Sequence, residues 1–200
     1  TAYAWSGPNG YTANVANPTI ANSTTANAGT YNVTLTNPTT GCSVEASTIV
    51  NVNANPVVTA SNTGAYCAGQ TIELSAVSSD ATSFAWSGPN GYASAQQNPV
   101  IANAVTNNGG SYTVVATNAN NCSAQASTVV TVNANPTANA SNTGAYCEGQ
   151  TITLQTTATG TYVWSGPNGF SSTLQNPTIA NATDANAGTY TLVVSNANSC

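Results

Sequence analysis

Apolar and polar residues alternate along several short stretches of this chain. Ile72, Leu74 and Ala76 are separated by polar or less apolar neighbours, and Phe84 and Trp86 alternate in the same way. A period of two residues is typical of a β-strand with one buried face. The same pattern recurs in the sets Tyr31, Val33, Leu35; Tyr112, Val114, Ala116; Tyr190, Leu192, Val194; and Val130, Val132. The pattern therefore predicts an all-β chain.

A hexapeptide, Trp-Ser-Gly-Pro-Asn-Gly, occurs three times at the ends of predicted strands, at residues 5–10, 86–91 and 164–169. Proline presets the backbone for the second position of a β-turn, while asparagine and glycine tolerate left-handed backbone. We therefore expect each copy to be a strand end followed by a tight turn, with its tryptophan pointing into the core.

These turns belong to a repeating unit of about 80 residues. The tryptophans at positions 5, 86 and 164 are 81 and 78 residues apart, and the cysteines at 42, 122 and 200 are 80 and 78 apart. A period this long is typical of a compact all-β domain rather than of a solenoid unit. We expect three segments, called here the first repeat (residues 1–55), the second repeat (56–135) and the third repeat (136–200), with Asn-Ala-Asn-Pro linkers at 53–56 and 133–136.

Three aromatic positions recur in every repeat. The tryptophan of the turn and a later strand-opening tyrosine are expected to anchor each core, namely Trp5, Trp86, Trp164, Tyr31, Tyr112 and Tyr190. The ring that follows the turn, which is Tyr11, Tyr92 or Phe170, has two interpretations. It either stacks on the sugar rings of a bound glycan or covers the sheet edge beside the turn, and the second interpretation is favoured.

The amino-acid composition argues against several classes of function. The chain has no Lys, Arg or His, and its formal net charge is −5. Nucleic-acid affinity rests on Lys and Arg, so the sequence argues against that class of partner. Without His or Lys the usual general bases are missing, and we predict no catalytic residue and no enzyme activity. The five carboxylates are scattered along the chain, so we also expect no metal site and no cofactor. No apolar run reaches the length of a membrane span.

The repeats resemble an immunoglobulin-like (Ig-like) β-sandwich. Asn-Ala-Gly-Thr-Tyr at 27–31 and 186–190, and Asn-Gly-Gly-Ser-Tyr at 108–112, are similar to the tyrosine-corner signature before strand F. Gly-Gln-Thr-Ile-Glu-Leu at 69–74 resembles strand B, and Trp86 falls where strand C carries its buried tryptophan. The closer likeness is to the Ig-like tandem repeats of large bacterial surface proteins and adhesins, which carry Cys-x-Gly before strand B and a cysteine shortly after strand F. Antibody domains differ, because they have cysteines where this chain has Ala76 and Val114.

The resemblance implies tandem Ig-like β-sandwich domains of about 80 residues, arranged head to tail in a secreted or surface-anchored array. On this basis the first repeat holds strands C to G, the second is complete, and the third lacks its last strand. A sandwich without those strands exposes its core and its sheet edges. We therefore expect either an excerpt of a longer array, which is favoured, or a subunit completed by strands from its neighbours.

Five cysteines are candidates for disulfides: Cys42, Cys67, Cys122, Cys147 and Cys200. Such cysteine use fits small domains in an oxidising, extracellular location. In an Ig-like topology the cysteines before strand B and after strand F lie at opposite ends of a domain, about 25 Å apart, whereas a disulfide needs Cα atoms within about 7 Å. This favours pairs that span a junction between repeats, such as Cys67 with Cys200. Pairing within one repeat, Cys67–Cys122 and Cys147–Cys200, stays open.

The sequence thus predicts a structural or adhesive extracellular repeat protein, forming a cell-surface stalk, adhesin or filament. Its expected partners are other copies of itself, neighbouring repeats and surface glycans. The alternative is a carbohydrate-binding module of a secreted protein.

Overall fold

The computed structural model describes residues 1–200. Every regular element is a β-strand or a single-turn 3-10 helix, so the prediction of an all-β chain is confirmed. Backbone contacts group the chain into two compact units. One unit consists of Thr1–Thr59, Ala76–Ala85 and Val114–Ala126, and the other of Ala60–Ser75, Trp86–Thr113 and Ser127–Cys200. None of the helices has the length and apolar character needed to cross a membrane.

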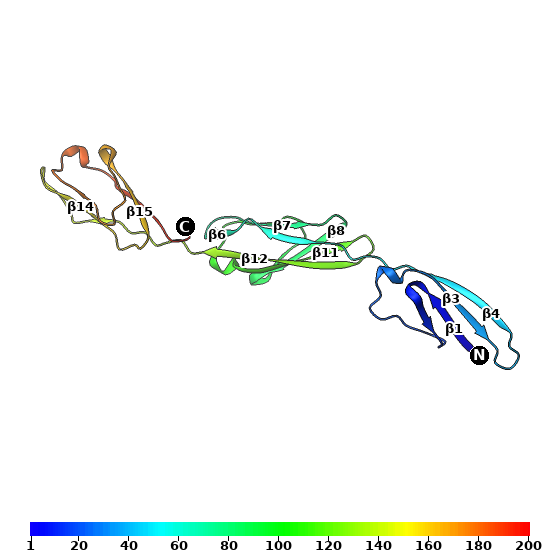
Figure 1. The fold of residues 1–200 in the computed structure, drawn as a ribbon. Helices are drawn as coiled ribbons and strands as arrows, with labels where there is room; N and C mark the ends of the chain where they lie inside the picture. Colours follow the sequence, from blue (N-terminus) through cyan, green and yellow to red (C-terminus); the bar gives the residue numbers. More distant parts are fainter. The chain divides into compact units, whose positions relative to one another are not determined.

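The first repeat folds as one antiparallel sheet. Its strands are β1 (Ala2–Gly7), β2 (Tyr11–Ala13), β3 (Gly29–Thr36) and β4 (Ser43–Val50), in the order β2-β1-β3-β4, and its helices are η1 (Pro8–Gly10) and η2 (Thr25–Asn27). Strand β3 pairs with β1 at Val33↔Trp5 and with β4 from Gly29↔Val50 to Thr36↔Ser43. Figure 1 shows these strands side by side. Of the alternating residues of β3, Tyr31 and Val33 are buried.

The second repeat forms two sheets. The first has the order β10-β7-β5 and consists of β5 (Thr59–Asn62), β7 (Ile72–Val77) and β10 (Val100–Ile101). The second has the order β6-β12-β11-β8-β9 and consists of β6 (Ala65–Cys67), β8 (Ala81–Gly88), β9 (Tyr92–Ser94), β11 (Gly110–Asn118) and β12 (Ser123–Asn133). The helices are η3 (Pro89–Gly91) and η4 (Thr106–Asn108). Strand β6 runs parallel to the end of β12, with Cys67 opposite Asn133.

The third repeat is a sandwich of two smaller sheets. One has the order β13-β14-β17, from β13 (Ser141–Asn142), β14 (Ile152–Gln155) and β17 (Thr178–Ile179), and the other the order β16-β15-β18, from β15 (Thr161–Ser165), β16 (Ser171–Ser172) and β18 (Thr191–Ser195). The helices are η5 (Pro167–Gly169) and η6 (Asp184–Asn186). Ile152 and Leu154 of β14 pack with Trp164 of β15 in one buried cluster, so side chains from both sheets form the core.

Of the alternating residues predicted to face inward in the second repeat, Phe84 is half-buried and the others are buried. They include Ile72, Leu74 and Ala76 on β7 and Tyr112, Val114 and Ala116 on β11. These sheets are those of tandem Ig-like β-sandwich domains, as the sequence predicts. The residue boundaries 1–55, 56–135 and 136–200 stay a prediction.

Candidate functional site

The recurring hexapeptide is held in place by a tyrosine ring. In the second repeat, Gly88 lies so close to the ring of Tyr112 that a Cβ atom at Gly88 would overlap it. Gly110, two residues before Tyr112, has the same relation to Pro89, whose Cγ would lie 2.8 Å from a Cβ atom there. Asn90, the residue after Pro89 in the turn, has a left-handed φ of 55°. The residue types of the turn therefore follow from close packing between strand C and strand F of each repeat.

Each strand-opening tyrosine also makes a tyrosine corner. The hydroxyl groups of Tyr31, Tyr112 and Tyr190 donate hydrogen bonds to the carbonyl oxygens of Asn27, Asn108 and Asn186, at 2.8, 2.9 and 2.8 Å. A buried tyrosine hydroxyl needs such a partner, and the bond to a residue four positions upstream is the arrangement known from Ig-like sandwiches. Tyr31 and Tyr112 are buried, while Tyr190 is half-buried.

The three candidate stacking rings pack against these tyrosines. Tyr11, Tyr92 and Phe170 are half-buried. Each meets its tyrosine edge to face, with ring centroids 5.4 Å apart. Such pairs contribute to packing beyond the area that they bury. Each ring thus packs against the strand-opening tyrosine of its own repeat.

The tryptophans differ in burial between repeats. Trp86 is 2% and Trp164 is 1% exposed, whereas Trp5 is half-buried. The indole N–H of Trp5 donates to the carbonyl oxygen of Val15 at 3.1 Å, and that of Trp86 to Gln97 at 3.2 Å. The indole N–H of Trp164 is buried without a partner. Trp5, which the sequence predicts to be a core anchor, is only half-buried because the first repeat has only one sheet.

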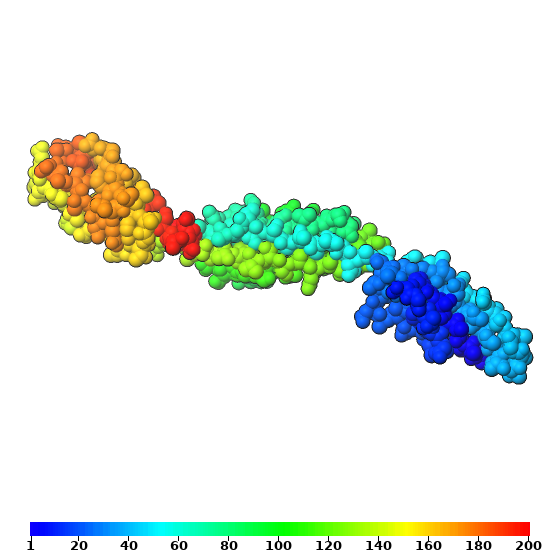
Figure 2. All heavy atoms as spheres, in the orientation of Figure 1, coloured from blue at the N-terminus to red at the C-terminus, as the bar shows by residue number.

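The structure joins Cys67 to Cys200 by a disulfide, with Cα atoms 5.5 Å apart. This is the junction-spanning pair, which links the second repeat to the third across 133 residues of sequence. Figure 1 marks the C-terminus, and Figure 2 shows the atoms of the last residues in red.

Hydrogen bonds to the Asn-Ala-Asn-Pro linker surround this disulfide. The N–H of Ala68 donates to the carbonyl oxygen of Asn133 at 2.8 Å, and the side-chain amide of Asn135 donates back to the carbonyl of Ala68 at 3.0 Å. The amide of Asn196 donates to the carbonyl of Ala134 at 2.9 Å. We call this set of contacts the junction clamp. Bonds to backbone groups hold the linker in one conformation, which a flexible tether would not have.

The side-chain amide of Asn118 makes the same linker contact one repeat earlier. It donates to the carbonyl oxygen of Ala54 at 3.0 Å, and its own Oδ1 accepts the N–H groups of Asn120 and Cys122. Cys122 thereby takes the position relative to Ala54 that Cys200 takes relative to Ala134. Its thiol is unpaired and lies 3.8 Å from the carbonyl oxygen of Asn53. Asparagine is so common in this chain that Asn118 and Asn196 do not stand out in the sequence.

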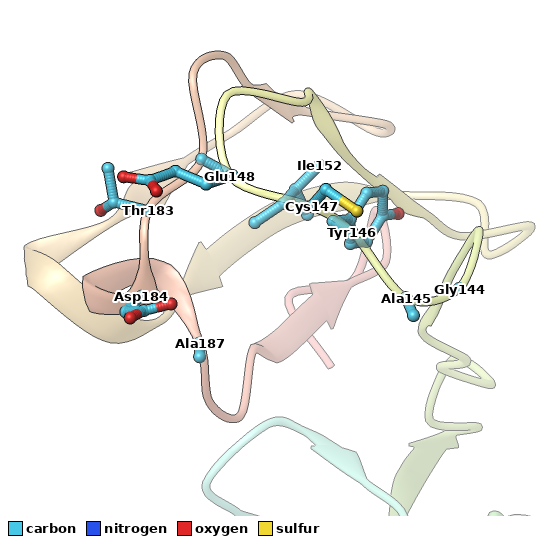
Figure 3. Close-up of a pocket in the computed structure, with 10 residues that line it drawn as sticks. Gly144, Ala145, Tyr146, Cys147, Glu148, Ile152, Thr183, Asp184 and Ala187 are labelled. Carbon is cyan, nitrogen blue, oxygen red and sulfur yellow. The ribbon is translucent and has the colours of Figure 1, made fainter.

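The two remaining cysteines, Cys42 and Cys147, are free and exposed. Cys147 borders a hollow of about 210 Å³ that Glu148 and Asp184 also line. Figure 3 shows the sulfur of Cys147 on the side of Tyr146, with both carboxylates across the hollow. Nowhere in residues 1–200 do three or more His, Cys, Asp or Glu side chains gather in a way that could hold a metal ion.

Three tyrosines have altered acidity for structural reasons. Burial raises the pKa of Tyr112, with a smaller contribution from Tyr92, and burial also raises the pKa of Tyr190. In contrast, a hydrogen bond from the side chain of Thr143 lowers the pKa of Tyr146. Each of these hydroxyls is engaged with a residue four or fewer positions away. Their altered pKa values thus reflect packing and turn formation.

No protein-family model matches the chain, and no curated protein matches its sequence. Solved structures with tandem domains are similar to it. An E-to-A mutated variant of titin domains I67–I69 is 16% identical to this chain in sequence. The match covers 98% of this chain and 83% of the titin chain, with a TM-score of 0.47. Drosophila OTK extracellular domains 3–5 are 14% identical, with 98% and 81% covered and a TM-score of 0.44. The three N-terminal domains of the bacteriophage RB49 outer capsid protein Hoc are 19% identical, with 96% and 75% covered and a TM-score of 0.38. At these sequence identities, the functions of those proteins are not assigned to this chain.

Proposed function

We propose that the chain is a structural segment of an extracellular repeat protein of the bacterial surface or adhesin type, in which Ig-like repeats supply length and a repeated surface. It serves as part of a stalk, adhesin or filament. The observation that carries this proposal is the Cys67–Cys200 disulfide together with the junction clamp around it. A disulfide between two repeats keeps them from separating.

The disulfide changes how the chain responds to force. Tension applied between Thr1 and Cys200 runs along the chain as far as Cys67 and from there through the disulfide to Cys200. The segment between these cysteines, with a sequence separation of 133, is therefore protected from stretching. Fully extended, that segment would span about 450 Å. The disulfide is thus suited to carry load past the linker at 133–136.

The bond also supports an extracellular location. Disulfides form and persist in secreted and surface proteins and are rare where thiols are kept reduced. The absence of Lys and Arg leaves trypsin no cleavage site, which favours survival outside the cell. Surface placement and the bacterial origin belong to this proposal.

Carbohydrate binding is the weaker candidate. The rings of Tyr11, Tyr92 and Phe170, which would have to stack on a sugar, already pack edge-on against core tyrosines. A sugar platform usually presents the face of an aromatic ring to solvent, whereas these rings are half-buried.

Two measurements test the proposal. Antibodies against the chain should label intact cells of its source without permeabilisation, and labelling only after permeabilisation would contradict a surface role. Single-molecule stretching of the oxidised chain, tethered at both ends, should release about 450 Å less contour length than stretching of the reduced chain. A Cys42→Ser variant serves as the control and should behave like the wild type. Equal lengths in the oxidised and reduced chains would contradict the load path.

A further inference from the structure

Five asparagines begin an Asn-x-Ser/Thr sequon, the sequence that the transfer of an N-linked sugar requires. In a chain so rich in Asn and Thr, several sequons arise by chance. The structure separates them, because a sugar on the Nδ2 atom of asparagine needs an amide that is exposed and makes no other contact in the folded chain. The five residues are Asn22, Asn32, Asn121, Asn139 and Asn181.

Three of these sequons lack such an amide or lie in a constrained place. The side-chain amide of Asn139 is bonded to residues 156–157, through both its Nδ2 and its Oδ1 atoms. Asn32 lies on β3, which is paired on both sides with β1 and β4, so its sequon is part of a sheet. Asn121 belongs to the loop that hydrogen-bonds to the linker at 53–56, and a bulky group there would crowd the linker.

The other two sequons occupy equivalent turns. Asn181 follows β17 and has a left-handed φ of 52°, and Asn22 has a φ of 51° at the same place in the first repeat. Both asparagines are exposed, and neither side chain forms a hydrogen bond. The second repeat has the same turn, with a φ of 52° at Asn103. Its third position is Val105, so the second repeat has no sequon there.

Backbone hydrogen bonds hold the turn with its sequon facing outward. The N–H of Ala182 donates to the carbonyl oxygen of Gln150, and the carbonyl oxygen of Ala182 accepts the N–H of Gly149, both at 2.8 Å. Ala182 is buried, whereas Asn181 and Thr183 on either side of it are exposed. A sugar on Asn181 would therefore extend into solvent without displacing a packed side chain.

We propose that Asn181 is a site of N-linked glycosylation and that Asn22 is the equivalent site in the first repeat. The sugar donor is a glycosyl diphosphate. The proposal rests on the extracellular location in the proposed function, since Asn-x-Ser/Thr sequons mark surface loops of secreted proteins. Glycans are bulky and solubilising, which suits a chain in which charged residues make up only 2% of the sequence.

The transfer exchanges one bond of the sugar for another. The amide nitrogen of Asn181 attacks the anomeric carbon of the donor sugar and forms a carbon–nitrogen bond. The bond between that carbon and the diphosphate oxygen breaks, and the diphosphate ester leaves with the electron pair. One proton of the amide passes to a base of the transferase. Nothing is oxidised or reduced, and no further reactant is needed.

The test maps sugars on the chain as its source produces it. The protein is purified from the source, digested with pepsin and analysed by mass spectrometry that locates a sugar on a single side chain. Asn181 should carry a sugar in most copies, and Asn103 should carry none. Thr183→Val copies the second repeat and should abolish the sugar at Asn181, whereas Thr183→Ser keeps the sequon and should retain it.

A gain of modification provides the sharpest control. Val105→Thr introduces at the second repeat the residue that the other two repeats have at this position, so the turn should accept it and Asn103 should gain a sugar. An unmodified Asn103 in this variant would overturn the proposal, because the turn would then not determine the site. A sugar on Thr183 in place of Asn181, or equal occupancy of Asn139 and Asn181, would also overturn it.

The same material distinguishes this proposal from the proposed function. An unmodified Asn181 in a chain that antibodies label on intact cells would overturn the glycosylation site and leave the surface role in place. An unmodified Asn181 in a chain that is labelled only after permeabilisation would overturn both.

Discussion

Gly88 packs flat against the ring of Tyr112, and the same relation joins Gly7 to Tyr31 and Gly166 to Tyr190. The contact ties the turn after strand C to the tyrosine corner of strand F. We expect Gly88→Ala to destabilise the second repeat by about 1–3 kcal/mol, because the added methyl group overpacks a tight contact. Urea unfolding measures the change. The neighbouring Ser87 is exposed, so Ser87→Ala should stay within about 0.5 kcal/mol, and equal losses in both variants would contradict this explanation.

The side chain of Asn118 forms hydrogen bonds both within its own loop and to the linker at 53–56. Replacing it with Ala removes the bond to Ala54 and the acceptor for the N–H groups of Asn120 and Cys122. We expect a loss of roughly 1–3 kcal/mol, since the change removes three hydrogen bonds made by a buried side chain. Chemical unfolding measures it, and Asn120→Ala, at an exposed position, is the matched control. A loss confined to Asn120→Ala would show that the side chain of Asn118 is dispensable.

The Cys67–Cys200 bond should stabilise the segment that it encloses. We expect Cys67→Ser to lower the unfolding free energy by about 2–5 kcal/mol. Fluorescence of Trp164 during urea unfolding follows the change, and a reducing agent should have the same effect on the wild type and none on the variant. Cys42→Ser, at a free and exposed position, should leave the midpoint unchanged. An equally stable Cys67→Ser protein would mean that the bond contributes nothing to the fold.

The tyrosines should titrate in a defined order. Tyr146 should ionise below a pKa of 10 because of its bond to Thr143, and Tyr112 and Tyr190 above it because of burial. A raised folded-state pKa contributes stability that is complete below pH 10 and is lost as the pH rises through the folded value. We therefore expect alkaline unfolding to begin above about pH 10. NMR of the tyrosine ring carbons measures the order, and ionisation of Tyr112 before Tyr146 would contradict it.

The chain has no histidine, so no side chain of that type titrates near neutral pH. We expect the free energy of unfolding to change by less than about 1 kcal/mol between pH 6 and 8. Urea unfolding at several pH values within this window provides the measurement.

Tyr92 distinguishes the packing role of the outer ring from sugar binding. We expect Tyr92→Ala to destabilise the second repeat by about 1–3 kcal/mol, since it removes the edge-to-face contact with Tyr112 and part of the buried area. Thermal unfolding measures this change. A glycan array probed with both proteins provides the alternative outcome, because an equally stable variant that has lost glycan binding would favour the carbohydrate-binding role.

Much of the fold could be predicted from the sequence, since alternation at Ile72, Leu74 and Ala76 directly reports a buried strand face. The repeat spacing and the turn chemistry of Gly-Pro-Asn-Gly added the organisation into similar units. The half-buried state of Trp5 was not predicted, because burial depends on a second sheet that a strand's own residues do not reveal. The linker contacts of Asn118 and Asn196 were missed for a related reason. Each asparagine forms a hydrogen bond to a residue more than 60 positions away. The local sequence pattern does not indicate such a distant contact.

A single covalent bond, between Cys67 and Cys200, joins the second repeat to the third. Peptide mapping of native, unreduced protein by mass spectrometry tests it most directly. Because trypsin has no site, pepsin at low pH suits the digestion, where disulfide exchange is slow. The structure predicts a cross-linked peptide that contains Cys67 and Cys200. Recovery of Cys67 linked to Cys122 and Cys147 linked to Cys200 would contradict the account, because each repeat would then be closed on itself.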